Sequence, residues 1–197
     1  MAVLEIIKEG DPRLRQKAVR VRKVDDEVRK LAQSMMDTIE VTPYAIALAA
    51  PQVGVLRRVI AVKIPASDPE ESDEADEGAE DSPESIEAVE LMLANPEIVR
   101  ASGRQVGIEG CLSIPGWIGE VPRAMNVTVK GRDMDDKEVR IKASGFLARA
   151  LQHEIDHLDG ILFVDLVEDK ETLRYEPEED EEEPESSSLT GQQGRED

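Results

Sequence analysis

Cysteine, histidine and aromatic residues are scarce in this chain of 197 residues. The single cysteine, Cys111, excludes an intrachain disulfide and fits a reducing compartment. No stretch approaches the roughly 18 apolar residues of a membrane-spanning helix. Residues 1–9 lack the basic start and apolar core of a secretory signal. We therefore expect a cytoplasmic protein without a membrane segment.

Basic residues are almost absent from two segments. Residues 66–90 contain 12 acidic side chains and no basic one, and residues 176–197 contain ten acidic and one basic. The remaining 150 residues carry 22 acidic and 23 basic side chains, so the net charge of −20 lies in these segments. Such a chain is a poor candidate for direct binding of nucleic acid or anionic membranes. We predict a single domain over residues 1–174 with an acidic loop inserted at 66–90, followed by a disordered acidic tail at 175–197.

Apolar periodicity predicts helices and strands in a characteristic order. The expected elements are helices at 25–39 and 144–158, strands at 58–64 and 91–96, and a hairpin formed by 126–130 and 138–142. Asp25 and Ser144 are expected to be the N-caps of the two helices. Strands followed by a late helix predict an α+β fold, in which mainly antiparallel sheets pack around the helix of residues 144–158.

The only two histidines of the chain lie four residues apart in this late helix. His153 and His157 therefore share one helical face, where both imidazoles can bind one metal ion. Glu154 follows the first histidine, a position from which a carboxylate can act as general base on a metal-activated water. Asp156 or Asp159 can accept the second N–H of an imidazole and orient the ring. The alternative interpretation is a pair of surface histidines.

A catalytic metal site of this type needs a third protein ligand. The longer metzincin pattern would place a third histidine at Phe163, which excludes that class. We place Cys111 ahead of any carboxylate, because it is the only soft ligand and follows Gly110, which lets the backbone approach a metal closely. A metalloprotease that uses a downstream carboxylate such as Glu168 or Glu171 is the second hypothesis.

A third stretch, residues 45–54, is an apolar strand that ends in a turn. Gln52 is the polar group at its end and could donate a hydrogen bond to a developing oxyanion. Taken alone, this glutamine is equally well explained as a polar cap on a buried strand.

The three stretches, in this order, resemble the motifs of the peptide deformylase family. Residues 109–113 match Glu-Gly-Cys-x-Ser, and residues 153–160 match His-Glu-x-x-Asp-His-Leu-x-Gly. Four positions match the first motif, Gly-x-Gly-Leu-Ala-Ala-x-Gln: Leu48, Ala49, Ala50 and Gln52. The resemblance spans most of residues 1–65 and 89–174.

This resemblance implies a metal-dependent amidase that removes formate from the N-formylmethionine of newly made polypeptides. The implied metal ligands are Cys111, His153 and His157, with Fe²⁺ as the usual ion and Zn²⁺ or Ni²⁺ as replacements. The implied catalytic groups are Glu154, which takes a proton from water and delivers it to the leaving amine, and Gln52 with the backbone N–H of Leu112, which stabilise the oxyanion. Ile46, Phe146 and Ala150 would line the methionine pocket, and Gly110 and Ala47 would contact the peptide backbone.

One departure from the family pattern motivates a third hypothesis. The glycines of the first motif are Ala45 and Ala47 here, in a strand that in the family pairs with the substrate backbone. Two extra methyl groups would narrow the cleft, and alanine would be strained wherever φ must be positive. The third hypothesis is a metal-binding homologue without deformylase activity, retained as an interaction protein. The acidic segments could bind a basic partner, for example a ribosomal protein.

Overall fold

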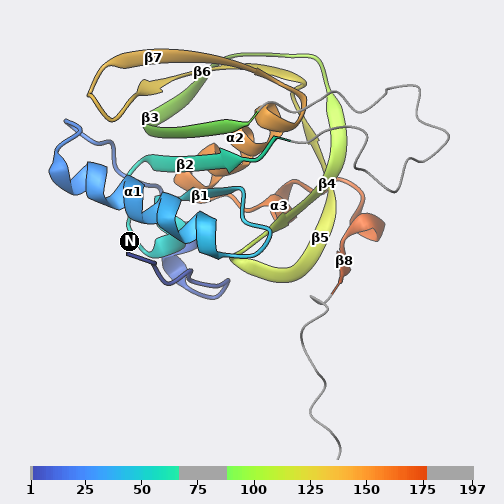
Figure 1. Ribbon diagram of the computed structural model, residues 1–197. Helices are drawn as coiled ribbons and strands as arrows, with labels where there is room; N and C mark the ends of the chain where they lie inside the picture. Colours follow the sequence, from blue (N-terminus) through green and yellow to red (C-terminus); the bar gives the residue numbers. More distant parts are fainter. Residues whose placement is uncertain (1, 67–87, 177–197) are drawn as a thin grey trace, which may run out of the picture.

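A computed structural model describes residues 2–66 and 88–176 (Figure 1). In this part of the chain, two antiparallel sheets enclose the late helix α2 (Gly145–Leu158) (Figure 1). The predicted α+β fold, with antiparallel sheets around the helix that carries both histidines, is confirmed. None of the described helices is long and apolar enough to cross a membrane.

The larger sheet has five strands in the order β1-β2-β3-β6-β7. These strands are β1 (Ala47–Ala49), β2 (Val59–Ile64), β3 (Val89–Ser102), β6 (Asn126–Arg132) and β7 (Glu138–Ser144). β6 and β7 form the predicted hairpin, in which Lys130 lies opposite Arg140. Because β1 is at the edge of this sheet, one of its sides has no partner among the described strands.

The larger sheet carries a helix on each face. Val62 of β2 belongs to the same buried cluster as Leu151 of α2, whereas its neighbour Ala61 belongs to the cluster of Met35 in α1 (Asp26–Val41). A strand covered on both faces is apolar at successive positions, which explains the unbroken apolar run in β2. The side chain of Asp25 accepts a hydrogen bond from the N–H of Val28, so the predicted cap of α1 is confirmed.

The smaller sheet contains β4 (Gln105–Cys111), β5 (Ile114–Arg123) and β8 (Arg174–Tyr175). It was not predicted from the sequence, because Gly107 and Gly110 interrupt the pattern of β4 and Ile108 points outward with 53% of its surface exposed. A turn of two residues, Leu112 and Ser113, joins β4 to β5. Ile114 of β5 packs with Phe163 of the short helix α3 (Phe163–Leu166) in a third buried cluster.

Three single turns of 3₁₀ helix complete the described chain: η1 (Pro12–Arg15), η2 (Ala50–Val53) and η4 (Lys170–Thr172). The turn after α2 requires glycine, since Gly160 has φ of +77° and an added Cβ would lie 2.6 Å from the carbonyl oxygen of Arg15. At the other end of α2, Ser144 occupies the predicted N-cap position, but its side chain makes no capping hydrogen bond.

Two predicted boundaries differ from the structure by one or two residues. Val89 and Glu90, assigned to the acidic insert, begin β3 and pair with β2. Tyr175, assigned to the acidic tail, pairs with Trp117 in the smaller sheet. The rest of the predicted insert and tail, residues 67–87 and 177–197, lies outside the described residues.

Candidate active site

A pocket of about 360 Å³ lies where β1, β4 and α2 meet. Ten of the eleven residues to which the family resemblance assigns a role line it: Ile46, Ala47, Gln52, Gly110, Cys111, Leu112, Phe146, Ala150, His153 and Glu154. The eleventh, His157, is 1% exposed and lies beside His153, with their ring centroids 4.9 Å apart. The tertiary structure thus gathers segments that are separated by about 100 residues along the chain.

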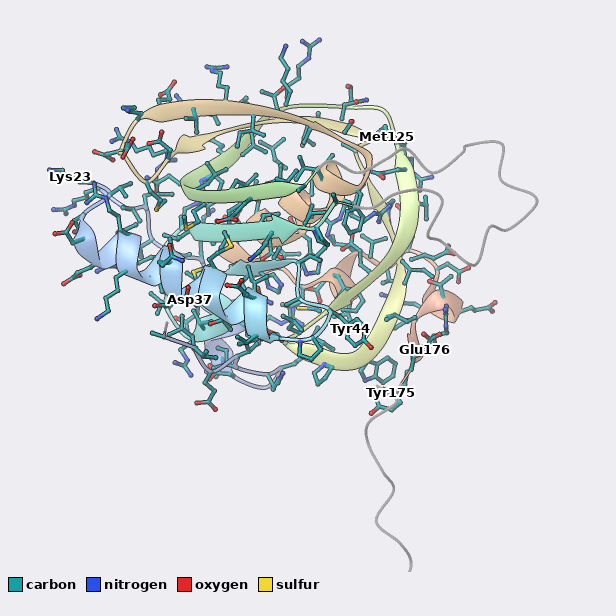
Figure 2. The ribbon with its side chains drawn as sticks, in the orientation of Figure 1. Lys23, Asp37, Tyr44, Met125, Tyr175 and Glu176 are labelled. Atoms are coloured by element: carbon teal, nitrogen blue, oxygen red, sulfur yellow. The ribbon has the colours of Figure 1, made fainter. Side chains whose placement is uncertain are left out.

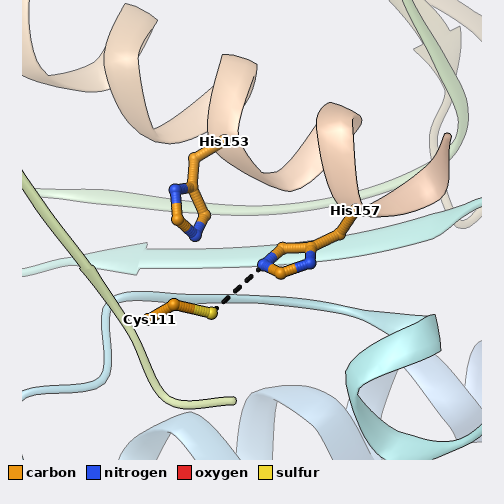
Figure 3. A group of neighbouring side chains, drawn as sticks. All are labelled: Cys111, His153 and His157. Atoms are coloured by element: carbon orange, nitrogen blue, oxygen red, sulfur yellow. Dashed lines mark hydrogen bonds between the residues drawn. The ribbon is translucent and has the colours of Figure 1, made fainter. Parts of the chain in front are cut away.

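Three possible metal ligands converge at this pocket (Figure 3). Cys111 is the last residue of β4, while His153 and His157 project from successive turns of α2. One ligand atom from each of the three lies within 4.8 Å of the other two, and Cys111 Sγ is 3.3 Å from His157 Nε2. Among the described residues, this is the one group of three or more candidate ligands, and it contains no aspartate or glutamate.

The donor set fits a divalent transition metal. A tetrahedral ion with a metal–sulfur distance of about 2.3 Å and metal–nitrogen distances of about 2.0 Å separates its donors by roughly 3.3–3.6 Å. The distance of 3.3 Å between Cys111 Sγ and His157 Nε2 agrees with that spacing. One thiolate and two imidazoles leave a fourth position for water or substrate, as catalytic metal sites require.

Glu109 orients His153, and the sequence analysis did not assign it this role. Its Oε2 lies 2.9 Å from His153 Nδ1, which directs the other ring nitrogen toward the ligand group. The sequence analysis considered Asp156 or Asp159 for this role, and neither aspartate side chain bonds to a histidine ring in the described structure. Asp156 instead accepts a hydrogen bond from Arg123, and Asp159 pairs with Arg58.

Two arginines hold Glu109 in turn. Arg123 donates to both carboxylate oxygens at 2.9 Å, and Arg149 of α2 donates to Oε1 at 3.2 Å. Burial by itself raises the pKa of Glu109, but the hydrogen bonds from Arg123 and His153 outweigh burial and lower the pKa to about 2. Glu109 is therefore a fixed negative charge beneath the pocket, although only 6% of its surface is exposed.

Both histidine rings are strongly influenced by burial, which disfavours the imidazolium form. For His157, burial and the positive charge of the His153 ring lower the pKa well below its usual value, which favours the neutral ring that can bind a metal. For His153, burial acts in the same direction, but hydrogen bonds to Cys111 and Glu109 raise the pKa above its usual value.

Glu154 lies next to the ligand group, on the wall of the pocket. It is 3% exposed, and its Oε2 has no hydrogen-bond partner among the described residues. Burial raises the pKa of this carboxyl to about 7. A buried carboxylate oxygen without a protein partner is suited to hold a water molecule or a reacting group.

Gln52 and Leu112 both line the pocket that contains the ligand group. Gln52 accepts a hydrogen bond from the N–H of Ala49 through Oε1, at 2.8 Å, which directs its amide NH₂ toward the pocket. That NH₂ lies 3.4 Å from Cys111 Sγ and 3.4 Å from Ser113 Oγ. One end of the Gln52 amide therefore caps the strand, while the other end points to the ligand group. Its role as an oxyanion donor stays a prediction.

The two alanines that replace the family's glycines are not strained. The described non-glycine residues with positive φ are Tyr44, Asn95 and Asp136, so neither Ala45 nor Ala47 requires a left-handed backbone. Both alanines line the pocket.

The few aromatic residues of the chain gather at this site, and of these the sequence analysis selected Phe146 alone. Tyr44, Trp117 and Phe146 line the pocket with 90%, 41% and 42% of their surfaces exposed. Tyr175, which is labelled in Figure 2, contacts Trp117 edge-on at a centroid distance of 5.8 Å. Phe163 stacks against His153 at a centroid distance of 6.3 Å. Exposed aromatic side chains around a pocket are typical of a surface that binds a ligand.

Comparison with known proteins shows the family to which this chain belongs. Residues 3–172 match the sequence pattern of the family described as polypeptide deformylase. The chain belongs to the peptide deformylase family. A peptide deformylase of Thermomicrobium roseum is 62% identical over 96% of this chain and 100% of its own length. One from Roseiflexus castenholzii is 45% identical over 81% of this chain and 84% of its own length.

Solved structures agree with this assignment. The crystal structure of peptide deformylase from Ehrlichia chaffeensis has a TM-score of 0.72 and 36% identity, covering 84% of this chain and 88% of its own. The Met-Ala-Ser-bound enzyme of Acinetobacter baumannii has a TM-score of 0.71 and 34% identity, covering 84% of this chain and 99% of its own. The protein is thus a metal-dependent hydrolase that removes the formyl group from the N-terminal formylmethionine of newly made polypeptides.

The alternative hypotheses do not fit these findings. The carboxylates considered for a metalloprotease lie away from the ligand group: Glu168 pairs with Arg104 on the surface at 3.0 Å, and Glu171 is exposed in η4. The surface-histidine interpretation is wrong, since His157 is almost completely buried. The absence of strain at Ala45 and Ala47 removes one argument for a homologue without activity.

Proposed function

We propose that the pocket performs deformylation with a metal ion held by Cys111, His153 and His157. A thiolate with two imidazoles suits Fe²⁺ or Zn²⁺, and Fe²⁺ is our proposed native ion, with Zn²⁺ and Ni²⁺ as functional replacements. When bound, the ion polarises water and the formyl carbonyl. Glu109 supports the site by holding His153 in the required orientation.

Glu154 is the proposed general base and acid. The single observation that carries this role is its unpartnered, buried Oε2 on the pocket wall beside the three ligands. From this position, Glu154 takes a proton from the attacking water and delivers it to the departing amine of methionine. The products are formate and a free N-terminal methionine.

Gln52 and Leu112 are the proposed oxyanion donors. The Gln52 NH₂ is held near Cys111 Sγ, and the Leu112 N–H belongs to the first residue after this cysteine. Fixed donors stabilise the negative charge that develops on the formyl oxygen without having to reorient during the reaction, and one such donor contributes about 3 kcal/mol.

The substrate backbone is proposed to lie between two strand edges. β1 and β4 are edge strands of their sheets, and the pocket is lined by Ala47 of β1 and Gly110 of β4. An extended peptide can hydrogen-bond to such edges as an added strand. Ile46, Phe146 and Ala150 are proposed to surround the methionine side chain, because all three line the same pocket.

We further propose that the enzyme works in the cytoplasm, where new polypeptides carry the formyl group, and that it acts close to the ribosome. A pocket lined by exposed aromatic side chains is suited to capture an extended chain as it emerges. Co-sedimentation with ribosomes that carry formyl-Met chains, compared with empty ribosomes, would test this association.

Two variants test the catalytic assignment. Glu154→Ala should keep its metal but lose nearly all formate release from formyl-Met-Ala-Ser, whereas Glu171→Ala, at an exposed glutamate, should behave as the unchanged protein. Cys111→Ala should lose the metal under this proposal and keep it if a carboxylate is the third ligand. Normal turnover by Glu154→Ala would exclude this residue as the base.

A further inference from the structure

The N-terminal segment joins the two loops that carry the proposed oxyanion donors. Three consecutive residues, Ile7, Lys8 and Glu9, each donate one hydrogen bond to a backbone carbonyl next to the pocket. The N–H of Ile7 donates to Gln52 at 2.8 Å, and the N–H of Glu9 donates to Ser113 at 2.8 Å. Between them, the ammonium of Lys8 donates to the carbonyl oxygen of Leu112 at 2.7 Å.

These three carbonyls belong to the parts of the backbone that must be fixed for oxyanion binding. Leu112 and Ser113 form the whole turn between β4 and β5, and both of their carbonyl oxygens are bound by the N-terminal segment. The Leu112 N–H lies in the peptide group before the one whose carbonyl Lys8 binds, and the φ and ψ angles of Leu112 link the direction of the N–H to that of the carbonyl. The carbonyl of Gln52 is bound by the same segment. Residues 7–9 therefore help to fix the distance between the backbone at Gln52 and the backbone at Leu112, which carry the two proposed donors.

Lys8 is the member of this group that acts through its side chain. The residue is exposed and lies 104 positions from Leu112 in the sequence. A hydrogen bond from an ammonium group to a carbonyl is stronger than one from a neutral donor. A two-residue turn has few internal hydrogen bonds of its own, so an external donor restricts its motion.

We propose that Lys8 is a positioning residue for the deformylation reaction, which holds the Leu112–Ser113 turn so that the oxyanion donors stay preorganised. This inference rests on the proposed roles of Gln52 and Leu112. Lys8 does not touch the reacting atoms in this proposal. It limits the reorientation of the Leu112 N–H, and preorganisation of such a donor affects the transition state more than the bound substrate.

Lys8→Met tests the proposal, because methionine keeps an unbranched side chain but removes the donor. With metal-loaded protein and formyl-Met-Ala-Ser, we expect kcat to fall roughly three- to tenfold. KM, metal content and the melting temperature should stay unchanged. Lys8→Arg, which restores a cationic donor, should recover most of kcat. The matched control is Lys30→Met, at an exposed position of α1.

Several outcomes would overturn the proposal. A Lys8→Met variant with the kcat of Lys30→Met has no positioning role, and neither does one that loses metal or melts earlier in proportion to its lost activity. Gln52→Ala separates this inference from the proposed function. If Gln52→Ala keeps full kcat, the oxyanion assignment fails and the role of Lys8 fails with it, whereas a loss in Gln52→Ala without a loss in Lys8→Met rejects Lys8 alone.

Discussion

Replacement of Glu109 by glutamine should weaken both the metal site and the fold. The carboxylate accepts four hydrogen bonds: Oε1 from Arg123 and Arg149, and Oε2 from Arg123 and His153. Glutamine has the same shape, but one oxygen becomes an NH₂ that faces two donors. Whichever way the amide is turned, two of the four hydrogen bonds are lost and at least one buried donor remains unpaired, since Arg149 also donates to the carbonyls of Gly107 and Val121.

The size of the expected loss in unfolding free energy follows from the burial of these side chains. Glu109 is 6% exposed, and Arg123 and Arg149 are each 8% exposed, so water cannot replace the lost partners fully. Each buried hydrogen bond to a charged group contributes about 1.5–3 kcal/mol. The variant should therefore lose about 3–5 kcal/mol of unfolding free energy, which is the usual cost of breaking a buried ion pair. For a chain of this size, the loss corresponds to a melting temperature lower by roughly 10 °C.

The effect on the metal should be separable from the effect on the fold. With its Nδ1 acceptor altered, His153 is a poorer ligand, and metal affinity should fall roughly 10- to 100-fold. Competition with a chromogenic chelator at a temperature where the variant is folded measures this affinity directly. Glu120→Gln on the exposed side of β5 is the matched control. Metal affinity within twofold of the unchanged protein would refute the orienting role of Glu109.

Three further substitutions test other parts of the structure. Gly160→Ala should lower the unfolding free energy by about 2 kcal/mol or more. Gly10→Ala, also at positive φ but with no atom within 4 Å of the added Cβ, should lower it by about 1 kcal/mol. Equal losses in denaturant titration would contradict the close contact at Gly160. Arg58→Met should cost about 2–3 kcal/mol, because the buried guanidinium binds two backbone carbonyls and a carboxylate, and its exposed neighbour Arg57→Met should cost less than 1 kcal/mol. Gln52→Ala should lower kcat roughly 100-fold with little change in KM, and an unchanged kcat would exclude it as a donor.

The local patterns of the chain were sufficient to predict most elements and to select the three candidate metal ligands that the fold brings together. Helical periodicity predicted α1 and α2 to within two residues, and alternation predicted the β6–β7 hairpin. His153 and His157 are four residues apart, which is about one turn of an α-helix, and Cys111 is the only cysteine in the chain. These predictions succeeded because helices and hairpins depend on residues that are close in the sequence, and because the chain offers only two histidines and one cysteine as candidate ligands.

The side chains that hold the site residues in place could not be predicted from the sequence. Arg149 and Glu109 are 40 residues apart in the sequence, and Lys8 and Leu112 are 104 residues apart. Neither pair can therefore be recognised from a local periodic pattern. The smaller sheet escaped prediction because the glycines of β4 weaken its alternation. The orienting partner of His153 was sought nearby on the same helix, but it comes from the facing strand.

Composition and spacing by themselves therefore determined which groups are candidates for the site: two imidazoles one helical turn apart, a carboxylate beside them, and one thiol. The arrangement that makes these groups work came from the tertiary structure. Only the packing of β4 against α2 brings Cys111 to 3.3 Å from His157, buries Glu154 and encloses Glu109 between two arginines. The physical reason is that ligand spacing on a helix is a local property, whereas burial and charge pairing arise between segments that meet only when the chain is folded.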